Sequence, residues 1–128
     1  MRIAINTLII EDNSVLLVRK KLTWILPGGK PSQGEDDIAC LCREISEELS
    51  GTRLKDFKYY ADFEGKTPHQ GDILKARVYF AKIDGQLNPI SAEIKEKKFV
   101  PNKDMDSYKL SDITSKIINS LRNDKYII

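Results

Sequence analysis

WILPGGKPSQGEDDIACLCREISEELSG, residues 24–51, is the stretch from which we predict the fold of this chain. It opens with a strong chain breaker, Pro27-Gly28-Gly29, and a loop that runs through Gly34. From Glu35 to about Leu49, apolar residues recur at steps of three and four, which predicts a helix with one apolar stripe. The expected helix starts with an acidic turn, as the helix dipole favours, and ends at Ser50-Gly51. The members of the expected stripe are Ile38, Leu41, Cys42, Ile45 and Leu49.

Two strands are expected before this helix. Residues 2–12 and 14–21 are rich in β-forming side chains and meet at Asp12-Asn13, a polar pair that favours a tight turn. Polar and acidic residues interrupt the first apolar run well below the length of a membrane span. The start also lacks the small-residue cleavage site of a signal peptide. We therefore interpret it as the first strand of a cytoplasmic protein.

After the helix, residues 53–63 and 73–83 predict two longer strands, with a polar loop over 64–72 between them. A short strand near 98–100 follows. Residues 111–122 predict a closing helix, and Ser111 is its expected cap. Strands on both sides of a central helix, with a second helix at the end, indicate one mixed α/β layered domain over the 128 residues.

Composition excludes several classes of protein. The chain has 41% hydrophobic and 31% charged residues, which is ordinary for a globular domain and argues against disorder. A net charge of +2 is too near balance to indicate a nucleic-acid partner. The two cysteines, Cys40 and Cys42, point to different faces of a helix, which suits neither a disulfide nor a metal clamp. We expect both to be small buried apolar residues.

Three glutamates share one side of the expected helix. With about 100° per residue, Glu44, Glu47 and Glu48 fall within an arc of about 100°, and the apolar stripe is centred about 120° away. Near a helix C-terminus the dipole opposes acidic side chains, and the like-charged pair at i and i+4 costs about 0.2–0.5 kcal/mol in an isolated helix. Local helix energetics would not select this arrangement.

Two interpretations of these glutamates are open from the helix alone: a solvated acidic face, or the ligands of a divalent cation. The preceding glycines favour the second. Gly28-Gly29 can bring bare backbone close to a ligand, and a loop carbonyl is a natural oxygen ligand. A set of oxygen ligands without a Cys/His cluster favours Mg²⁺, or Mn²⁺, over Zn²⁺.

The spacing of these residues resembles the Nudix box. Gly29, five residues, Glu35, seven residues and then Arg43-Glu44-Ile45-Ser46-Glu47-Glu48 match it, after a Trp24–Gly29 segment that is also typical of the family. One departure is that the closing glycine of the box falls on Ser50, while Gly51 takes the next position. The resemblance extends over nearly the whole chain. It implies a Nudix fold, a mixed β-sheet sandwiched between helices in α/β/α layers.

The resemblance also implies roles for residues of the box. Glu47 and Glu48 are the expected main metal ligands, with help from the Gly28 carbonyl. Glu44 is either a further ligand or the base that activates water. Glu35 and Arg43 correspond to the structural ion pair of the family, and Arg43 is also available to orient a glutamate at the catalytic site.

Other candidates lie outside the box. A late acid of the family is best matched by Glu93, with Glu96 second. It is either a ligand, a base or an exposed loop acid. Arg19 and Lys20 are expected to bind a phosphate of the substrate or to form a solvated strand end. Trp24 either stacks on a base or packs in the core. Three tyrosines of the later strands and a loop histidine are weaker candidates for pocket walls: Tyr59, Tyr60, Tyr79 and His69.

The expected function is Mg²⁺-dependent hydrolysis of a pyrophosphate bond in a nucleoside diphosphate linked to another group. Substrates of this class include nucleoside triphosphates, their oxidised forms as in MutT-like enzymes, ADP-ribose-like compounds and dinucleoside polyphosphates. The alternative is a Nudix-fold sensor module that binds a nucleotide without turnover, although such modules are expected to have damaged boxes. A small-molecule nucleotide is the expected partner of a monomer or homodimer, without nucleic acid or membrane.

Overall fold

The computed structural model describes residues 2–67, 72–85 and 97–128. In chain order the elements are β1 (Arg2–Leu8), β2 (Ile10–Glu11), β3 (Ser14–Lys20), β4 (Thr23–Ile25), β5 (Gly28–Gly29), α1 (Asp37–Glu48), β6 (Arg53–Lys66), β7 (Ile73–Asp84), β8 (Lys97–Pro101), the 3₁₀ helix η1 (Asn102–Ser107) and α2 (Asp112–Asn123).

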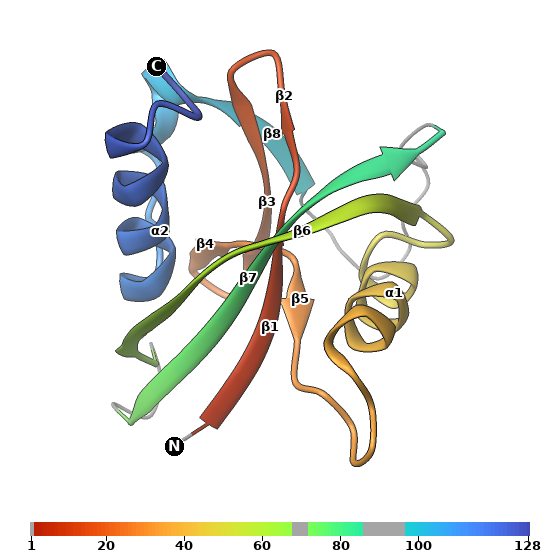
Figure 1. Cartoon of the computed structure of the whole chain (residues 1–128). Coiled ribbons are helices and arrows are strands. Elements are labelled where there is room, and N and C mark those ends of the chain that lie inside the picture. Colours follow the sequence, from red (N-terminus) through yellow and green to blue (C-terminus); the bar gives the residue numbers. More distant parts are fainter. Residues whose placement is uncertain (1, 68–71, 86–96) are drawn as a thin grey trace.

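Two sheets form the centre of the molecule. The larger has the order β5-β1-β7-β6, with β1 and β7 parallel and the other neighbours antiparallel. In the smaller, β3 pairs antiparallel with β2, β4 and β8. The helices α1 and α2 lie on opposite sides of the strands (Figure 1). The mixed sheet between helices is the α/β architecture expected from the sequence.

The first expected strand is in fact two strands in different sheets. Residues 2–8 pair with β7, whereas residues 10–11 turn into the smaller sheet, so the prediction of one strand over 2–12 was wrong. Ile9 lies at the change of sheet and is 1% exposed. The tight turn at Asp12-Asn13 is confirmed, since both residues have left-handed φ angles of 49° and 59°.

Helix α1 is shorter than predicted, and its buried face differs. It begins at Asp37, because the Asp36 side chain accepts a hydrogen bond from the Ala39 amide as an N-cap. Cys40, Leu41 and Ile45 are its buried residues. Ile38 and Cys42, both expected in the apolar stripe, are exposed. The expectation that both cysteines are buried is therefore wrong for Cys42, whereas burial of Cys40 raises the pKa of its thiol to about 11.

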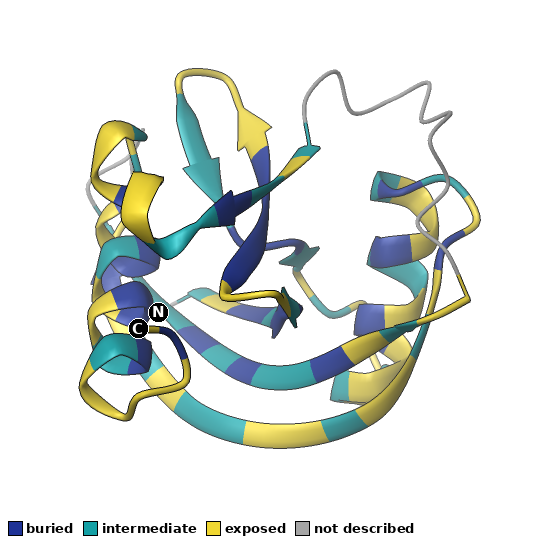
Figure 2. Cartoon of the chain, turned by 90° about the horizontal axis from the view of Figure 1, so that it is seen from above, coloured by how far each residue is buried: buried dark blue, intermediate teal, exposed yellow. Residues whose placement is uncertain are grey.

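Three apolar clusters hold the helices to the strands. The largest packs α2 against β1, β3, β7 and β8, and Figure 2 shows the buried residues of both helices turned inward. Ser111 caps α2 as predicted, with its hydroxyl accepting from the Thr114 amide. The second cluster seats Ile45 and Leu49 against the smaller sheet, and the third seats Cys40 and Leu41 on Ile5 of β1. Helix α1 is thus fixed on both sheets.

Smaller differences from the sequence concern strand ends. Gly28-Gly29, expected in a loop, forms β5 by pairing with Ile5 and Asn6 of β1. Strand β6 runs to Lys66, three residues beyond its predicted end, because its pairing with β7 continues through Gly65, which lies opposite Leu74. Within the described residues, none of the helices is long and apolar enough to cross a membrane.

Candidate active site

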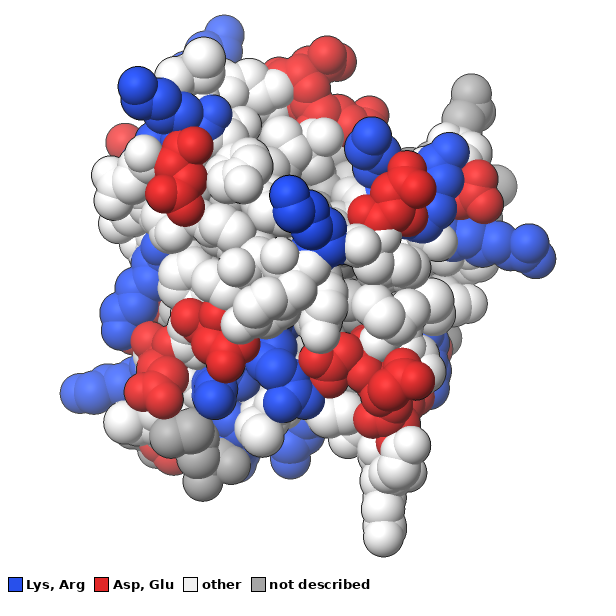
Figure 3. Space-filling model, in the orientation of Figure 1, with Lys and Arg blue, Asp and Glu red and all other residues white. Residues whose placement is uncertain are grey.

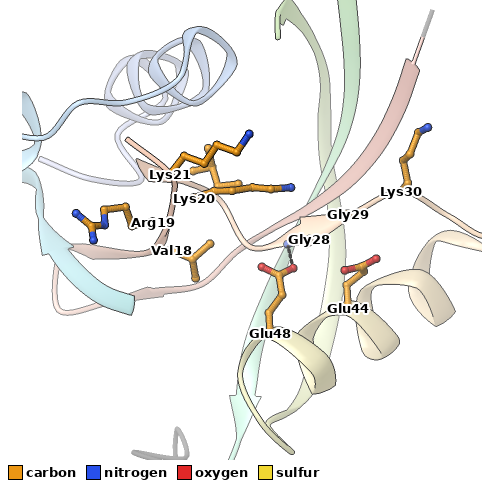
Figure 4. A pocket seen from close by; sticks show the side chains of 10 residues that line it. Val18, Arg19, Lys20, Lys21, Gly28, Gly29, Lys30, Glu44 and Glu48 are labelled. Carbon is orange, nitrogen blue, oxygen red and sulfur yellow. Dashed lines mark hydrogen bonds between the residues drawn. The ribbon is translucent and has the colours of Figure 1, made fainter. Parts of the chain in front are cut away.

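A cavity of about 630 Å³ opens between α1, β5 and the end of β3. Its walls differ in charge. Glu44 and Glu48 point from α1 toward the glycines of β5, while Lys20 at the end of β3 and Lys21 in the following turn also line this space (Figure 4). The full set of lining residues is Val18, Arg19, Lys20, Lys21, Ile25, Gly28, Gly29, Lys30, Glu44 and Glu48.

The two glycines allow the helix to approach β5 closely. A Cβ atom at Gly29 would lie 2.4 Å from the carboxyl carbon of Glu44, so any side chain here would displace that carboxylate. Gly28 has a φ of 141°, and a Cβ there would lie 2.1 Å from the Ile5 carbonyl oxygen. The glycine pair therefore makes room for Glu44 on one side and for β1 on the other.

Glu48 is the most perturbed carboxylate of the cavity. Its Oε1 accepts a hydrogen bond of 3.0 Å from the Gly28 amide. Burial raises the pKa of Glu48 to about 7, the Gly28 hydrogen bond opposes the rise, and the nearby charge of Glu44 adds to it. The charge of Lys20 also lowers this pKa but does not offset the burial, so Glu48 needs a further positive charge to ionise as readily as an exposed glutamate.

Arg43 joins the helix to the loop before it. Its guanidinium donates two hydrogen bonds of 2.9 Å to Glu35, and it also donates to Glu44 and to the Lys30 carbonyl, each at 3.0 Å. The Ser32 amide donates to the same Glu35 carboxylate. These contacts lower the pKa of Glu35 to about 2, with the Arg43 hydrogen bond as the main cause. The ion pair expected from the sequence is present.

The helix ends in two successive left-handed residues. Ser50 has a φ of 34° and Gly51 a φ of 77°, and the Gly51 amide closes the helix on the Ser46 carbonyl. A serine therefore takes a conformation that glycine adopts more readily. This is the local consequence of the shifted glycine, and it lies beyond the last glutamate of the cavity.

The donors around the cavity are oxygens, which suit Mg²⁺ or Mn²⁺. In the described ranges, no three His, Cys, Asp or Glu side chains are already gathered closely enough to hold a metal ion. The Glu47 side chain is 58% exposed and lies 3.7 Å from the Arg43 guanidinium, and it does not line the cavity. The oxygen donors of the cavity fit a divalent cation by their chemistry.

Comparison with known proteins shows the family of this chain. A family model described as the NUDIX domain matches residues 1–121. The chain belongs to the NUDIX family.

Solved structures agree with this assignment. A MutT NUDIX hydrolase from Burkholderia pseudomallei is 25% identical with a TM-score of 0.78, covering 92% of this chain and 95% of that one. A nudix hydrolase family member from Chromobacterium violaceum is 28% identical with a TM-score of 0.75, covering 96% and 77%. Both solved structures are NUDIX hydrolases, and the family generally uses divalent metal ions.

A viral relative is similar over a shorter stretch. The mRNA-decapping protein g5R of African swine fever virus is 39% identical over 56 residues, which is 38% of this chain and 22% of the viral protein. The NUDIX chain thus matches only about a fifth of that protein's length. The similarity supports the family and says little about the activity of the whole viral protein.

The structure locates most of the predicted site residues. Arg19 and Lys20 line the cavity together with Glu44 and Glu48. Trp24 is not among the lining residues; its ring meets the Tyr108 ring edge-on, with centroids 5.3 Å apart. Glu93, Glu96 and His69 lie outside the described residues. Of the three tyrosines, Tyr59, Tyr60 and Tyr79, none lines the two cavities described here.

Some lining residues escaped the sequence analysis. Lys21 and Lys30 flank the cavity, yet nothing in a lysine-rich sequence distinguishes them. A second cavity of about 220 Å³, between β1, β4, β7 and α2, was also not anticipated. Lys20 and Ile25 line both cavities, which therefore adjoin each other.

Charge on the surface is mixed. On the face that Figure 3 shows, lysine and arginine side chains alternate with acidic ones, and no continuous basic stripe crosses the described residues of that face. A stripe of that kind is typical of surfaces that follow a nucleic-acid backbone. The basic residues of the site are instead gathered at the cavity beside Glu48.

Proposed function

We propose that this chain hydrolyses a pyrophosphate bond in a nucleoside diphosphate linked to another group, with Mg²⁺ as its preferred cation. The observation that carries the proposal is the pairing of unlike walls across one cavity: Glu44 and Glu48 on α1, and Lys20 and Lys21 at the end of β3 and in the turn after it. The first wall suits a cation and the second suits the phosphates that the cation also contacts. Mn²⁺ is a competent substitute, because it prefers the same oxygen donors.

Glu44, Glu47 and Glu48 would hold the cation, with the Gly28 carbonyl as a further oxygen. The buried Glu48 favours this, since burial raises its pKa to about 7 even with the Gly28 hydrogen bond and the Lys20 charge beside it, and a bound cation would favour its ionised form. Arg43 keeps Glu44 in place through its 3.0 Å hydrogen bond. When bound, the cation neutralises the charge of the pyrophosphate and lowers the pKa of water.

The positive charges that would balance the substrate's phosphates come from Lys20, Lys21 and Arg19. Their side chains line the cavity opposite the glutamates, where they would bind the phosphate oxygens and stabilise the charge that develops as the bond breaks. Because water is the attacking group, no covalent nucleophile of the protein is required. A carboxylate acts as the base, and Glu44 is the described residue best placed for that second role.

The adjoining cavity would receive the nucleoside. It is lined by apolar side chains of Leu26, Leu74 and Ile117 and by polar groups of Asn6 and Thr23, a mixture typical of small-molecule sites. Lys20 stands where the two cavities meet. A nucleotide bound with its base in the smaller cavity would therefore extend its phosphates past Lys20 toward Glu48.

A substrate panel tests the proposal. Nucleoside triphosphates and their oxidised forms, ADP-ribose, dinucleoside polyphosphates and a capped RNA fragment are incubated with Mg²⁺ or Mn²⁺ at mildly alkaline pH. Phosphate, pyrophosphate and nucleotide products are measured separately. We expect turnover of at least one small nucleotide that disappears in EDTA. Turnover of none of them would contradict the proposal.

Conservative variants test the assignment of the glutamates. Glu47→Gln and Glu48→Gln are each expected to lower turnover at least 100-fold, because the charge of a ligand is lost while its size is kept. Glu44→Gln separates two roles: a ligand raises the half-saturating Mg²⁺ concentration, whereas a base lowers kcat with metal affinity unchanged. Near-normal turnover in both Glu47→Gln and Glu48→Gln would refute the ligand assignment. Glu11→Gln, an exposed glutamate of β2, is the control.

A further inference from the structure

Asp37 lies on the same line of α1 as the glutamates of the cavity. At about 100° per residue, Glu44 is about 20° to one side of Asp37 and Glu48 about 20° to the other. Glu47 is about 80° away, which matches its greater exposure. One stripe of the helix therefore starts at Asp37 and ends at Glu48.

This stripe crosses the larger sheet strand by strand. At its start, Asp37 contacts β7. In its middle, Leu41 packs with Ile5 of β1. At its end, Glu48 accepts from Gly28 of β5. Since the sheet order is β5-β1-β7-β6, the helix is tied to the sheet by a carboxylate at each end.

The contact at the start of the helix is specific. The Oδ1 of Asp37 accepts a hydrogen bond of 2.8 Å from the Arg77 guanidinium, and its Oδ2 accepts one of 2.5 Å from the Tyr79 hydroxyl. Both donors come from β7 and point to the face that carries α1. Each oxygen of the Asp37 carboxylate therefore binds a different donor of the same strand. The carboxylate is restrained in rotation as well as in position.

Arg77 makes this contact costly to lose. Its Nε is buried and has no hydrogen-bond partner among the described residues. Asp37 forms an ion pair with this guanidinium at 2.8 Å. Removing the carboxylate charge would take away the direct ion pair of this guanidinium, whose side chain is 35% exposed, and leave it the charge of Asp62, its cross-strand neighbour on β6.

We propose that Asp37 is a positioning residue: its contacts with Arg77 and Tyr79 fix the rotation of α1, so that Glu44 and Glu48 face the glycines of β5. A helix rotated by a few tens of degrees would carry Glu48 away from the Gly28 amide. The effect on metal binding rests on the proposed function, whereas the effect on helix rotation does not.

The test compares the first residues of the two helices. Asp37→Asn replaces one acceptor oxygen by a donor, so Arg77 and Tyr79 compete for the other oxygen. Asp112→Asn is the matched control. Asp112 is the first residue of α2, which like α1 is 12 residues long, and its carboxylate accepts a hydrogen bond from the Lys66 amide. Tyr79→Phe removes a single hydrogen bond and serves if Asp37→Asn does not fold.

The first measurement is the amide proton resonance of Gly28 in metal-free protein. This proton is donated to Glu48, so it reports the rotation of α1 directly. We expect it to move upfield in Asp37→Asn, to move less in Tyr79→Phe, and to stay in place in Asp112→Asn. An unchanged Gly28 resonance in folded Asp37→Asn would overturn the proposal.

The second measurement is Mn²⁺ binding to the protein without substrate. We expect the dissociation constant to rise about tenfold in Asp37→Asn, equivalent to about 1.4 kcal/mol, and to be unchanged in Asp112→Asn at a similar loss of thermal stability. Equal affinity in wild type and Asp37→Asn would count against the positioning role. If wild type binds no Mn²⁺, the proposed metal site fails, and the Gly28 resonance alone decides the role of Asp37.

Discussion

Among single residues, Gly29 sets the position of Glu44. The space that a Cβ would occupy at Gly29 is filled by the Glu44 carboxylate, with both of its oxygens within 2.7 Å of that point. The spacing of glycines and glutamates in the sequence indicated a site. Only the tertiary structure, which pairs β5 with β1 and brings Glu44 against it, shows why a side chain at Gly29 is excluded. The left-handed conformation of Ser50 is likewise visible only in the structure.

Gly29→Ala is expected to lower turnover at least tenfold, because the new methyl group displaces the Glu44 carboxylate from the cavity. The measurement is steady-state kinetics with a Mg²⁺ titration. In a Glu44→Ala background the space is free, so adding Gly29→Ala should have no further effect. An equal loss of activity in both backgrounds would show that the methyl group acts on the backbone and not on Glu44.

At the scale of elements, the loop over 30–36 is organised by α1. Arg43 binds Glu35 and the Lys30 carbonyl, and Glu35 in turn binds the Ser32 amide. The sequence predicted the ion pair by resemblance, yet it put Glu35 inside the helix. Sequence periodicity cannot distinguish an acidic residue inside the first helical turn from one in the preceding loop, such as Glu35, whose side chain contacts the helix from outside.

Glu35→Gln is expected to lower the melting temperature at pH 7. The pKa of Glu35 is lowered to about 2 in the folded chain, so its ionised form stabilises the fold above the ordinary value of 4.5. That contribution is lost as the pH falls from 4.5 toward 2, and the difference between variant and wild type should narrow over this range. Melting curves across pH check this, with Glu11→Gln as control; a difference that is constant with pH contradicts it.

For the whole molecule, the cavity beside α1 exists because the chain changes sheets. Strand β1 pairs with β5 and places the glycines under α1, while β3 of the smaller sheet brings Lys20 and Lys21 to the other wall. The break at Ile9 lets one N-terminal segment serve both sheets. Buried like charges in the cavity then couple the stability of the fold to pH and to cations.

Glu48→Gln should stabilise the metal-free chain at pH 8. The folded pKa of Glu48 is raised to about 7, so wild type is fully stable below the ordinary value of 4.5 and loses stability as the pH rises through 7. The variant avoids this loss, on the order of 1–3 kcal/mol, and keeps an oxygen for the Gly28 amide. Urea unfolding in EDTA at pH 4.5 and pH 8 measures the difference in unfolding free energy between variant and wild type, which should be present only at pH 8. Mg²⁺ should stabilise wild type and remove this difference. A difference in unfolding free energy at both pH values would contradict the prediction.

The sequence by itself determined the helix of the candidate site, its glutamates and the glycine pair before it, because helical geometry and chain breaking are local properties that a few neighbouring residues specify. Tertiary structure decided which side of that helix is buried, and it exposed Ile38 and Cys42. It also decided that Lys20 faces Glu48 and that Asp37 meets Arg77. These contacts depend on strand pairing and register between distant segments, where a shift of one residue would turn every side chain to the opposite face.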